Sequence, residues 1–575
     1  MAFNWRSVAA LAVLTSSFAL TACSNDDPTG PNDLPPTAAA VSASSATSAT
    51  VSWGAVVDAT NYIVERAPGT SGGTFTVISP TTLTATTFLD TGLEPNAPYR
   101  YRIQATRASG RSQYSAVVAV TTRASGTVSG VISGNITANR TLYADTLYTL
   151  QGFIQVTNGA TLLIQPGTRI RGDTTPAFVG SSLFITRGAK IDAQGTASNP
   201  IVFTSGFAAG TRQPGDWGGV IIIGKGIINK SGTVTIEGTG SPAATNPAQV
   251  YSGGDDNADN SGILRYVRIE FAGYATAQNQ ELNSLTLAAV GSGTTIDYVQ
   301  TLAGLDDSFE WFGGAVNAKH LVSYESGDDH FDMAEGYVGR LQYLIAMQTR
   351  IIPPRAAAGS PSIDPQGIEN DGCDGPACTG GQRATPYTIP VIANFTLYGT
   401  GTTNGVTLPV GGGRGMVLRR GTGGFYVNGI VSRFPTAAIS FRDTTTFERL
   451  TAGEFQLSNI LFVENGALFE PQTLPIVPAT TTRHYTVDTT ANNLRSVTGT
   501  ASALFTSVSA AQPTNGATFD WAPPAAGAAA TGGLATFTGA LQTRSGTIVV
   551  GTTYRGAADP SGVKWWQGWT TYAIN

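Results

Sequence analysis

The 575-residue sequence contains few histidines and cysteines, three of each. The cysteines form no Cys-x-x-Cys pair and no cluster with histidine, which argues against a zinc site. The histidines, His320, His330 and His484, leave little material for a histidine-based triad. Charged residues make up 12% of the chain, and the formal net charge is −5. A nucleic-acid partner requires a basic stripe, so this charge balance excludes that class of function.

The region from Gly126 onward also lacks helical periodicity of useful length. The chain instead contains 69 glycines and many threonine and serine residues. Such a composition suits short strands, in which β-branched residues pack well, and tight turns, in which glycine supplies positive φ. The length predicts two or three domains. We therefore expect an all-β protein of more than one domain.

The amino terminus contains a positively charged residue, Arg6, followed by an apolar stretch over Val8–Leu20. This pattern predicts a signal peptide over residues 1–22. Leu20–Cys23 resembles a bacterial lipobox, which implies lipidation of Cys23 and a membrane partner reached through a lipid anchor. Residues 23–36 are rich in Asp, Pro, Gly and Asn and predict a flexible tether. Ser24 after the cysteine favours, by resemblance, the outer membrane, and Asn25–Asp27 resembles the acidic surface-export signal of some lipoproteins.

Residues 37–123 alternate apolar and polar side chains in short runs, for example over Ala49–Trp53, Tyr62–Arg66 and Tyr99–Ala105. Period-two alternation with regularly spaced turns is typical of an antiparallel sandwich. The region resembles a fibronectin type III domain, with Trp53 as the early-strand tryptophan and Tyr99 at the tyrosine corner. The resemblance implies a spacer or a protein-contact module.

An internal repeat predicts the architecture of the long region that follows. Ile296–Glu310 aligns with Ala318–Asp332 at an offset of 22 residues, and Arg265–Ile269 matches the corresponding strand one coil earlier. A period of this length with short strands is typical of one coil of a β-helix, which buries its apolar face by stacking on its neighbours. We expect a β-helix over residues 126–484 and a C-terminal capping region over 485–575.

Several motifs in this region are similar to those of a family of bacterial surface lipoproteins and exported proteins. The resemblance implies a right-handed parallel β-helix of the pectin-lyase-like kind and no established activity. The expected fold class is thus an N-terminal fibronectin-III-like sandwich followed by this β-helix. The motifs are Gly215–Ile221, Ser261–Gly273, Val290–Ile296, Phe309–Gly314 and Trp566–Thr570.

An acidic ladder is the best candidate site. The 22-residue offset predicts that Asp306 stacks on Asp328, and Asp307 on Asp329, at the coil spacing of about 4.8 Å. Like charges at such a spacing are unfavourable unless a cation, a proton or hydrogen bonds compensate them. The candidate Ca²⁺ ligands are Asp306, Asp307, Glu310, Asp328, Asp329 and Asp332, and Glu335 follows in the same ladder.

Three interpretations of this ladder remain open. The carboxylates bind Ca²⁺, which prefers clustered oxygen ligands; or Asp306, Asp328 and Asp329 act as acid and base on a glycan; or they are turn residues that accept backbone N–H groups. A lyase also needs a base, and Arg340 and Arg350 are candidates that nothing distinguishes.

Three further features have both a structural and a functional interpretation. Cys373 and Cys378 predict a local disulfide in an oxidising compartment. The Asp255–Asn260 loop has part of the spacing of a calcium loop, and a solvated turn is favoured. The tryptophans near the C-terminus predict an end cap packed on the last coil, with a sugar-stacking platform as the alternative. These tryptophans are Trp565, Trp566 and Trp569.

The expected function is that of a cell-surface binding, adhesion or scaffold protein for a polysaccharide or a surface protein. Ca²⁺ is the one cofactor that the residues suggest. A polysaccharide lyase or glycoside hydrolase on the same fold is the alternative, because a fold alone does not decide between these classes. The missing catalytic constellation makes a non-enzyme the favoured hypothesis.

Overall fold

The computed structural model describes residues 34–242, 245–277, 280–359, 365–401, 412–471, 486–509 and 519–572. The predicted signal peptide, the predicted lipidation site Cys23, and His484 lie outside the described residues. No helix in the described part of the chain is long and apolar enough to span a bilayer. Two compact units are present: Met1–Ser42, Thr50–Asp90 and Pro98–Val120 form one, and the second contains Thr121–Asn575 with Ala43–Ala49 and Thr91–Ala97.

The small module consists of two sheets whose strands alternate buried and exposed residues. Trp53 is buried and packs edge-on against Tyr62, with ring centroids 5.3 Å apart. Tyr99 is also buried, as the predicted alternation requires. One sheet contains β1 (Ala40–Ala43), β2 (Ser48–Ser52) and β5 (Thr87–Thr91). The other contains β3 (Asn61–Pro68), β4 (Thr76–Val77), β6 (Pro98–Arg107), β7 (Gly110–Arg111) and β8 (Val118–Thr121).

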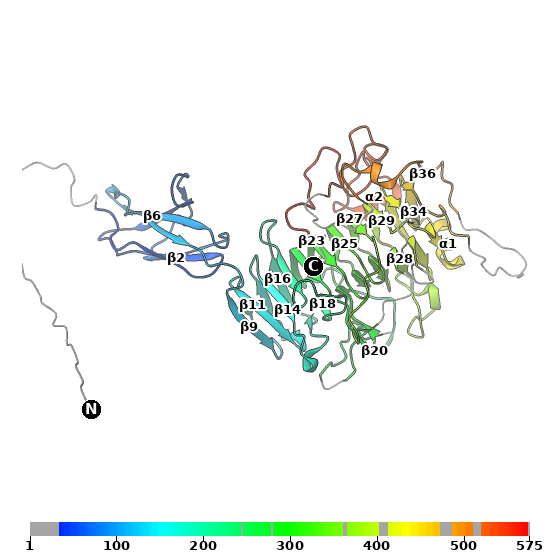
Figure 1. The fold of residues 1–575 in the computed structure, drawn as a ribbon, viewed down its shortest axis with the longest axis horizontal. Coiled ribbons are helices and arrows are strands. Elements are labelled where there is room, and N and C mark those ends of the chain that lie inside the picture. Colours follow the sequence, from blue (N-terminus) through cyan, green and yellow to red (C-terminus); the bar gives the residue numbers. More distant parts are fainter. Residues whose placement is uncertain are drawn as a thin grey trace, which may run out of the picture. The chain divides into compact units, whose positions relative to one another are not determined.

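The large unit is a β-helix built from parallel strands that stack coil upon coil (Figure 1). Its long sheet contains β9 (Val128–Ser133), β10 (Arg140–Leu142), β11 (Thr146–Gln151), β13 (Thr161–Ile164), β14 (Arg169–Gly172), β16 (Lys190–Gln194), β17 (Ile201–Thr204), β19 (Gly262–Glu270), β23 (Thr295–Leu302), β25 (Asn317–Tyr324), β27 (Arg340–Met347), β29 (Val391–Tyr398), β31 (Gly424–Val427), β32 (Ile430–Ser432), β34 (Phe455–Ser458), β35 (Leu461–Val463) and β36 (Arg495–Ser496).

A second, short sheet forms another wall of the β-helix. Its strands are β12 (Phe153–Val156), β15 (Ser182–Ile185), β18 (Gly219–Ile223), β22 (Leu285–Ala288), β24 (Phe309–Phe312), β26 (Phe331–Ala334), β28 (Gln366–Asp371), β30 (Arg414–Arg419) and β33 (Ala437–Phe441). Outside the two walls lie the hairpin β20 (Ala275–Ala277) and β21 (Gln280–Glu281), the helices α1 (Thr444–Thr451) and α2 (Gly539–Ser545), and short 3-10 turns at Pro176–Phe178, Gly381–Arg383 and Ala501–Leu504.

The predicted 22-residue repeat corresponds to one coil. Val299 of β23 pairs with Leu321 of β25, and Phe309 of β24 pairs with Phe331 of β26. Val267 of β19 pairs with Val299, as expected for the coil before. Alternate residues point into the helix, where the stacked apolar side chains form one continuous core that includes Phe309, Phe331 and Trp311.

The strands of the long sheet bend at a column of residues with left-handed backbone conformation. Tyr266, Tyr298, His320 and Tyr343 occupy this position with φ of 49°, 54°, 53° and 66°. Left-handed φ is uncommon outside glycine and turns the chain sharply. Each bend therefore places one side chain directly over that of the neighbouring coil, outside the core.

The C-terminal region has two parts with different positions. Val487 and Leu494 join the apolar core, and β36 pairs with β35 of the last complete coil. The stretch from Phe519 to Tyr572 instead packs along the outer side of the long sheet, where Trp566 and Trp569 are fully buried against residues of several coils. These two tryptophans therefore cover a wall of the β-helix instead of capping its end, because outward apolar side chains such as Val322 and Ile345 are present there.

Candidate functional site

The acidic ladder lies on the outer face of the short sheet. Glu310 of β24 pairs with Asp332 of β26, and Asp332 pairs with Glu369 of β28. Their strand neighbours, such as Phe309 and Phe331, point into the core. Because successive side chains of a strand point to opposite faces, the three carboxylates form one outward column.

The turns before β24 and β26 add the remaining aspartates of the ladder. Asp306 and Asp307 precede β24, and Asp328 and Asp329 precede β26 at the predicted offset. The coils approach so closely here that a Cβ atom on Gly327 would lie 1.8 Å from the carbonyl oxygen of Leu305. Glycine before Asp328 therefore allows the two acidic turns to stack.

The carboxylates converge on three overlapping triads. Within each triad, one oxygen atom of every member lies within 4.8 Å of the others. The triads are Asp306–Asp307–Asp328, Asp307–Glu310–Asp332 and Asp329–Asp332–Glu369. Asp307 and Asp332 each belong to two triads, so the whole ladder forms one continuous cluster. Six of its seven members are those predicted from the sequence.

Glu369 is the member that the sequence analysis missed. The coil that carries it is longer, because Phe331 pairs with Ile368 at an offset of 37 residues. A search at the fixed offset of 22 therefore passes over it. The alternation of Ile368, Glu369, Asn370 and Asp371 after an inserted loop is the signal that identifies this strand as the next rung.

An open cavity of about 1210 Å³ lies over the cluster. Twelve carboxylates and three cationic side chains line it. Asp307 and Glu310 are each only 6% exposed at its floor. The cationic residues are Lys230, Arg419 and Arg420, and carboxylates outside the triads are Glu237, Glu281, Glu335, Asp371 and Asp374.

Each cation at this cavity forms ion pairs. Arg419 contacts Glu369 and Asp371, the latter with Nε 2.8 Å from Oδ1. Arg420 contacts Asp371 at 2.5 Å and Asp374 at 3.2 Å. Lys230 Nζ lies 2.5 Å from Glu335 Oε1. The cations thus pair with Glu369 of one triad and with Glu335, Asp371 and Asp374 at the edges of the cavity, and the twelve carboxyl groups outnumber the three cations.

Burial and mutual repulsion both disfavour ionisation of the central carboxyls. Burial, followed by the charge of Asp328, holds the pKa of Asp306 and Asp307 well above the usual range. Burial and Asp332 do the same to the pKa of Glu310. The pKa values of Asp332 and Glu369 are likewise raised well above their usual range by burial and by Asp371. A bound cation would reverse this effect, because it stabilises the ionised form.

Hydrogen bonds satisfy part of the cluster, as the turn interpretation requires. Asp307 Oδ1 accepts the backbone N–H of Asp329 at 2.8 Å, and Asp329 Oδ1 accepts the N–H of Gln366. Glu310 accepts a hydrogen bond from the Asn283 amide. By contrast, the buried Oδ1 atom of Asp332 accepts no hydrogen bond from the described residues. Turn stabilisation therefore accounts for some of these oxygens and leaves others available to a ligand.

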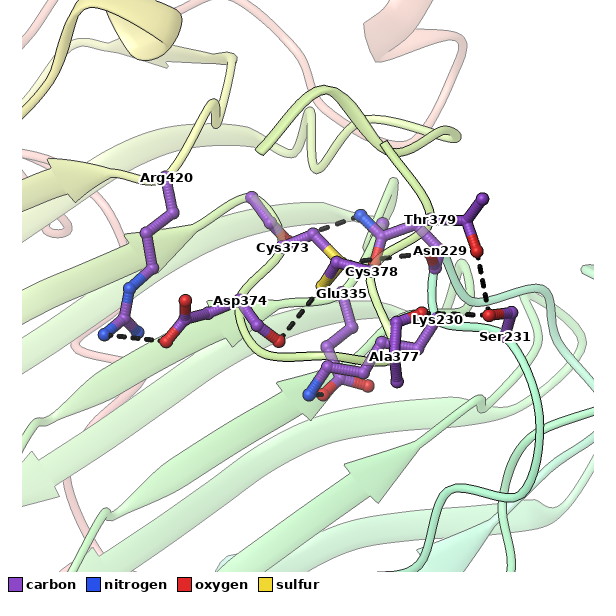
Figure 2. The surroundings of a disulfide bond; sticks show 12 residues. Asn229, Lys230, Ser231, Glu335, Cys373, Asp374, Ala377, Cys378, Thr379 and Arg420 are labelled. Atoms are coloured by element: carbon purple, nitrogen blue, oxygen red, sulfur yellow. Dashed lines mark hydrogen bonds and ion pairs between the residues drawn. A yellow bond between two sulfur atoms is a disulfide. The ribbon is translucent and has the colours of Figure 1, made fainter. Parts of the chain in front are cut away.

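A loop closed by a disulfide (Figure 2) contributes Asp374 to the lining of the cavity. Cys373 and Cys378 are bonded, with Cα atoms 5.9 Å apart. The loop follows Asp371 directly and contains Asp374, which faces Arg420 in Figure 2. Ser231 donates its backbone N–H to the Ala377 carbonyl at 2.8 Å and so ties the loop to the neighbouring chain segment. The disulfide therefore fixes the loop that carries Asp374 and that begins two residues after Asp371.

The other candidate residues lie elsewhere. Neither Arg340 nor Arg350 lines the acidic cavity. In the Asp255–Asn260 loop, Asp256 accepts the N–H of Ala258 at 2.8 Å, which supports a turn role. His330 is buried, and a hydrogen bond of 2.6 Å joins its Nδ1 atom to the Ser323 hydroxyl. Burial lowers the pKa of His330 to about 3.

Comparison with known proteins identifies the large unit. The sequence model of a pectate-lyase-like β-helix domain matches residues 134–521, more than half of the chain. The chain belongs to this family. A fibronectin type III domain model matches residues 34–121, so the predicted fold class is confirmed. No curated protein matches the chain. The pectate-lyase-like β-helix domain fits a carbohydrate-related protein, in either a binding or a catalytic role.

Matches among solved structures include proteins similar to the small module. A Fn3-like protein from Clostridium thermocellum is 29% identical over 16% of this chain and 94% of its own, with a TM-score of 0.15. The fn3 domain of human collagen alpha-1(XX) chain is 22% identical over 17% of this chain and 90% of its own, with a TM-score of 0.16. The FN5 domain of Drosophila Lar is 22% identical over 16% and 95%, with a TM-score of 0.14.

Proposed function

We propose that the protein is a cell-surface polysaccharide-binding protein, and that its acidic cavity holds Ca²⁺ through which it binds an acidic polysaccharide. The observation that carries this proposal is the set of three overlapping carboxylate triads in an open cavity of a pectate-lyase-like β-helix. Ca²⁺ takes six to eight oxygen ligands in flexible geometry, which clustered carboxylates supply. A bound cation leaves coordination positions for carboxylates of a uronate-containing chain.

Binding is favoured over lyase chemistry by the state of the cationic residues. A lyase requires a base next to the cation, and the three cationic side chains that line the cavity are Lys230, Arg419 and Arg420. All three are engaged in ion pairs with carboxylates. Their N–H groups are thus committed to protein carboxylates, and none of the three is placed to take a proton from a bound saccharide.

Glycoside hydrolysis is the second candidate function, and Glu237 is the observation that favours it. The surrounding protein, followed by the charge of Glu281, raises the pKa of Glu237 to about 7, while part of the Glu237 side chain stays exposed on the cavity side. Inverting and retaining glycosidases both use a pair of carboxyl groups. One of them keeps its proton near neutral pH, and the other is ionised. Under this hypothesis Glu237 is the general acid.

The location on the cell surface is part of the proposal and rests on the sequence. Cys23 in a lipobox-like motif would anchor the chain in the outer membrane, and the tether would be followed by the fibronectin type III module as a spacer. The β-helix would then present its acidic cavity to extracellular polysaccharide.

Calorimetric titration of Ca²⁺ into the metal-free protein tests the binding site. We expect saturable binding that Glu310→Gln and Asp332→Asn weaken at least about tenfold each, since each removes a charged ligand. Asp255→Asn is the matched control, because it removes the same charge from a turn outside the cavity. Equal Ca²⁺ affinity in all four proteins would refute the metal site.

Polysaccharide retention and turnover separate the two candidate functions. The protein is passed over immobilised polygalacturonate in Ca²⁺ and in EDTA, and soluble polysaccharides are assayed for new reducing ends and unsaturated products. Retention in Ca²⁺ alone, without turnover, supports binding. Turnover that Glu237→Gln abolishes would establish a hydrolase instead.

A further inference from the structure

A second groove, separate from the acidic cavity, runs along the turns that lead into the long sheet. Its volume is about 500 Å³. Ser292, Ala315, Val338 and Ile389 line it, and they precede β23, β25, β27 and β29 respectively. The groove thus crosses four successive coils, a distance on the order of 14 Å at about 4.8 Å per coil. It shares no lining residue with the acidic cavity.

Two arginines face this groove, Arg340 at the start of β27 and Arg544 near the end of α2. Leu541 of α2 is buried in a cluster with Val391 of β29, so the helix is fixed against the sheet. Arg340 Nε donates a hydrogen bond to the Arg544 carbonyl oxygen, which ties the two residues together. Both side chains are half-buried.

Neither guanidinium group has a carboxylate partner among the described residues, and that of Arg544 lies 5.8 Å from the centroid of the Phe425 ring. Among the described residues, neither group forms an ion pair, and no hydrogen bond is donated by the terminal nitrogen atoms of either one. The negative charge that acts on Arg544 is that of Glu454, which is itself paired with Arg449 at 2.8 Å. Burial and the charge of Arg340 lower the pKa of Arg544. Such a pair is completed by an anion.

The other polar groups of the groove are suited to the same kind of ligand. The side-chain oxygen of Asn257 accepts the N–H of Ile227 at 2.9 Å, so its amide nitrogen remains as a donor. Ser292 adds a hydroxyl group, and the remaining lining residues are apolar. A narrow apolar floor with donors at its margins fits a saccharide chain that carries oxyanions.

We propose that this groove is a second, metal-independent binding site for an oxyanion-bearing saccharide, held through its carboxylate or sulfate groups by Arg340 and Arg544. Each guanidinium presents two parallel N–H groups, which match the geometry of both anions. The site requires no cation, in contrast to the acidic cavity, and high salt weakens it by screening. The two sites would engage one acidic polysaccharide at two places on the β-helix.

The test measures saccharide binding in EDTA, which removes any contribution of bound Ca²⁺. The full chain carrying Cys23→Ser is titrated with trigalacturonic acid, with a sulfated trisaccharide and with maltotriose. We expect one or both anionic trisaccharides to bind and maltotriose not to bind. The stronger of the two identifies carboxylate or sulfate as the preferred group. Absence of binding by both anionic probes, or equal binding by maltotriose, overturns the proposal.

Variants assign the binding to the groove. Arg544→Gln keeps the backbone carbonyl that Arg340 contacts, and we expect it to weaken binding at least about tenfold. Arg340→Lys keeps the charge and should retain more affinity than Arg340→Gln. Arg495→Gln removes an exposed arginine elsewhere on the β-helix and should have no effect. Wild-type affinity of Arg544→Gln in EDTA contradicts the proposal, whereas the Ca²⁺ site is judged separately by Glu310→Gln.

Discussion

Two columns of outward side chains on the β-helix differ in how their stacked members interact with each other. On the long sheet, the rings of Tyr266, Tyr298, His320 and Tyr343 stack with centroids 4.3, 4.2 and 5.0 Å apart. The C-terminal stretch packs beside these rings and leaves them half-buried along a groove of about 450 Å³. On the short sheet, carboxylates occupy the equivalent outward positions and face an open cavity. Stacked rings attract each other, whereas stacked carboxylates repel unless a cation lies between them.

The comparison shows that a repeat of parallel coils places side chains of the same type at the same outward position of successive coils. An aromatic column is stabilised by its own stacking and packs on one side against the C-terminal stretch, as Tyr266 and Tyr298 do against Trp569. An acidic column is incomplete in itself, so it is the wall on which a ligand is expected. The following predictions test this contrast, beginning with the largest effect.

Trp569→Ala should cause the largest loss of stability. The Trp569 ring is fully buried and lies edge-on to Tyr266 and Tyr298, with centroids 5.8 and 6.0 Å away. Removal of a buried tryptophan leaves a cavity and costs about 3–5 kcal/mol. Urea denaturation measures the change, and Val563→Ala, at a side chain that is 86% exposed, is the control. A loss below about 1 kcal/mol would show that packing of the C-terminal stretch on the aromatic column contributes little to stability.

In EDTA, the protein should become more stable as the pH falls from 8 to 5. The pKa values of Asp306, Asp307 and Glu310 are raised in the folded state, so the folded protein binds more protons than the unfolded chain in this range. The contribution of these carboxyls to stability is therefore fully present below their ordinary pKa of about 4 and is lost as the pH rises through the raised values. Thermal denaturation across this range measures the trend.

With saturating Ca²⁺ the pH trend should reverse, because protons compete with the metal for the carboxylates. At pH 8, Ca²⁺ at one hundred times its dissociation constant should stabilise the folded protein by about 2.7 kcal/mol. Asp332→Asn should lose most of this gain, and Asp255→Asn should keep it. The same thermal denaturation experiment gives the answer; equal gains in both variants would place any bound Ca²⁺ outside the cavity.

His320→Ala should have the smallest effect. The imidazole lies between Tyr298 and Tyr343, and its Nδ1 atom is 2.7 Å from Asp297 Oδ1. Loss of an aromatic pair of this kind costs about 1 kcal/mol beyond its buried area. His320→Phe keeps a ring in the column and should recover most of the loss. If the two variants are equally stable in urea denaturation, stacking contributes little to the column.

The sequence predicts the coil and its acidic face because both repeat at a fixed offset. Phe309 and Phe331 identify the inward positions, and Glu310 and Asp332 follow as outward neighbours. Glu369 is not predicted from the sequence because an insertion lengthens the coil that carries it. The groove of Arg340 and Arg544 is also not predictable from the sequence, since these residues are 204 positions apart and only the tertiary fold brings them together.

For the C-terminal tryptophans, the prediction of burial is correct and the predicted position on the β-helix is wrong. Trp566 and Trp569 are apolar enough to predict burial, and burial is what the structure shows. Their sequence position at the end of the chain suggested the end of the β-helix as the place. The deciding information lies in outward apolar residues of distant coils, such as Val322 and Ile345, which need a cover.

Crystals grown with saturating Ca²⁺ and measured for anomalous scattering give the most direct test of the acidic cavity as a metal site. We predict anomalous density between Asp307, Glu310 and Asp332, with carboxylate oxygens at about 2.3–2.6 Å from the ion. Well-ordered carboxylates with no anomalous density among the three triads would contradict the account and leave these residues as turn-stabilising groups.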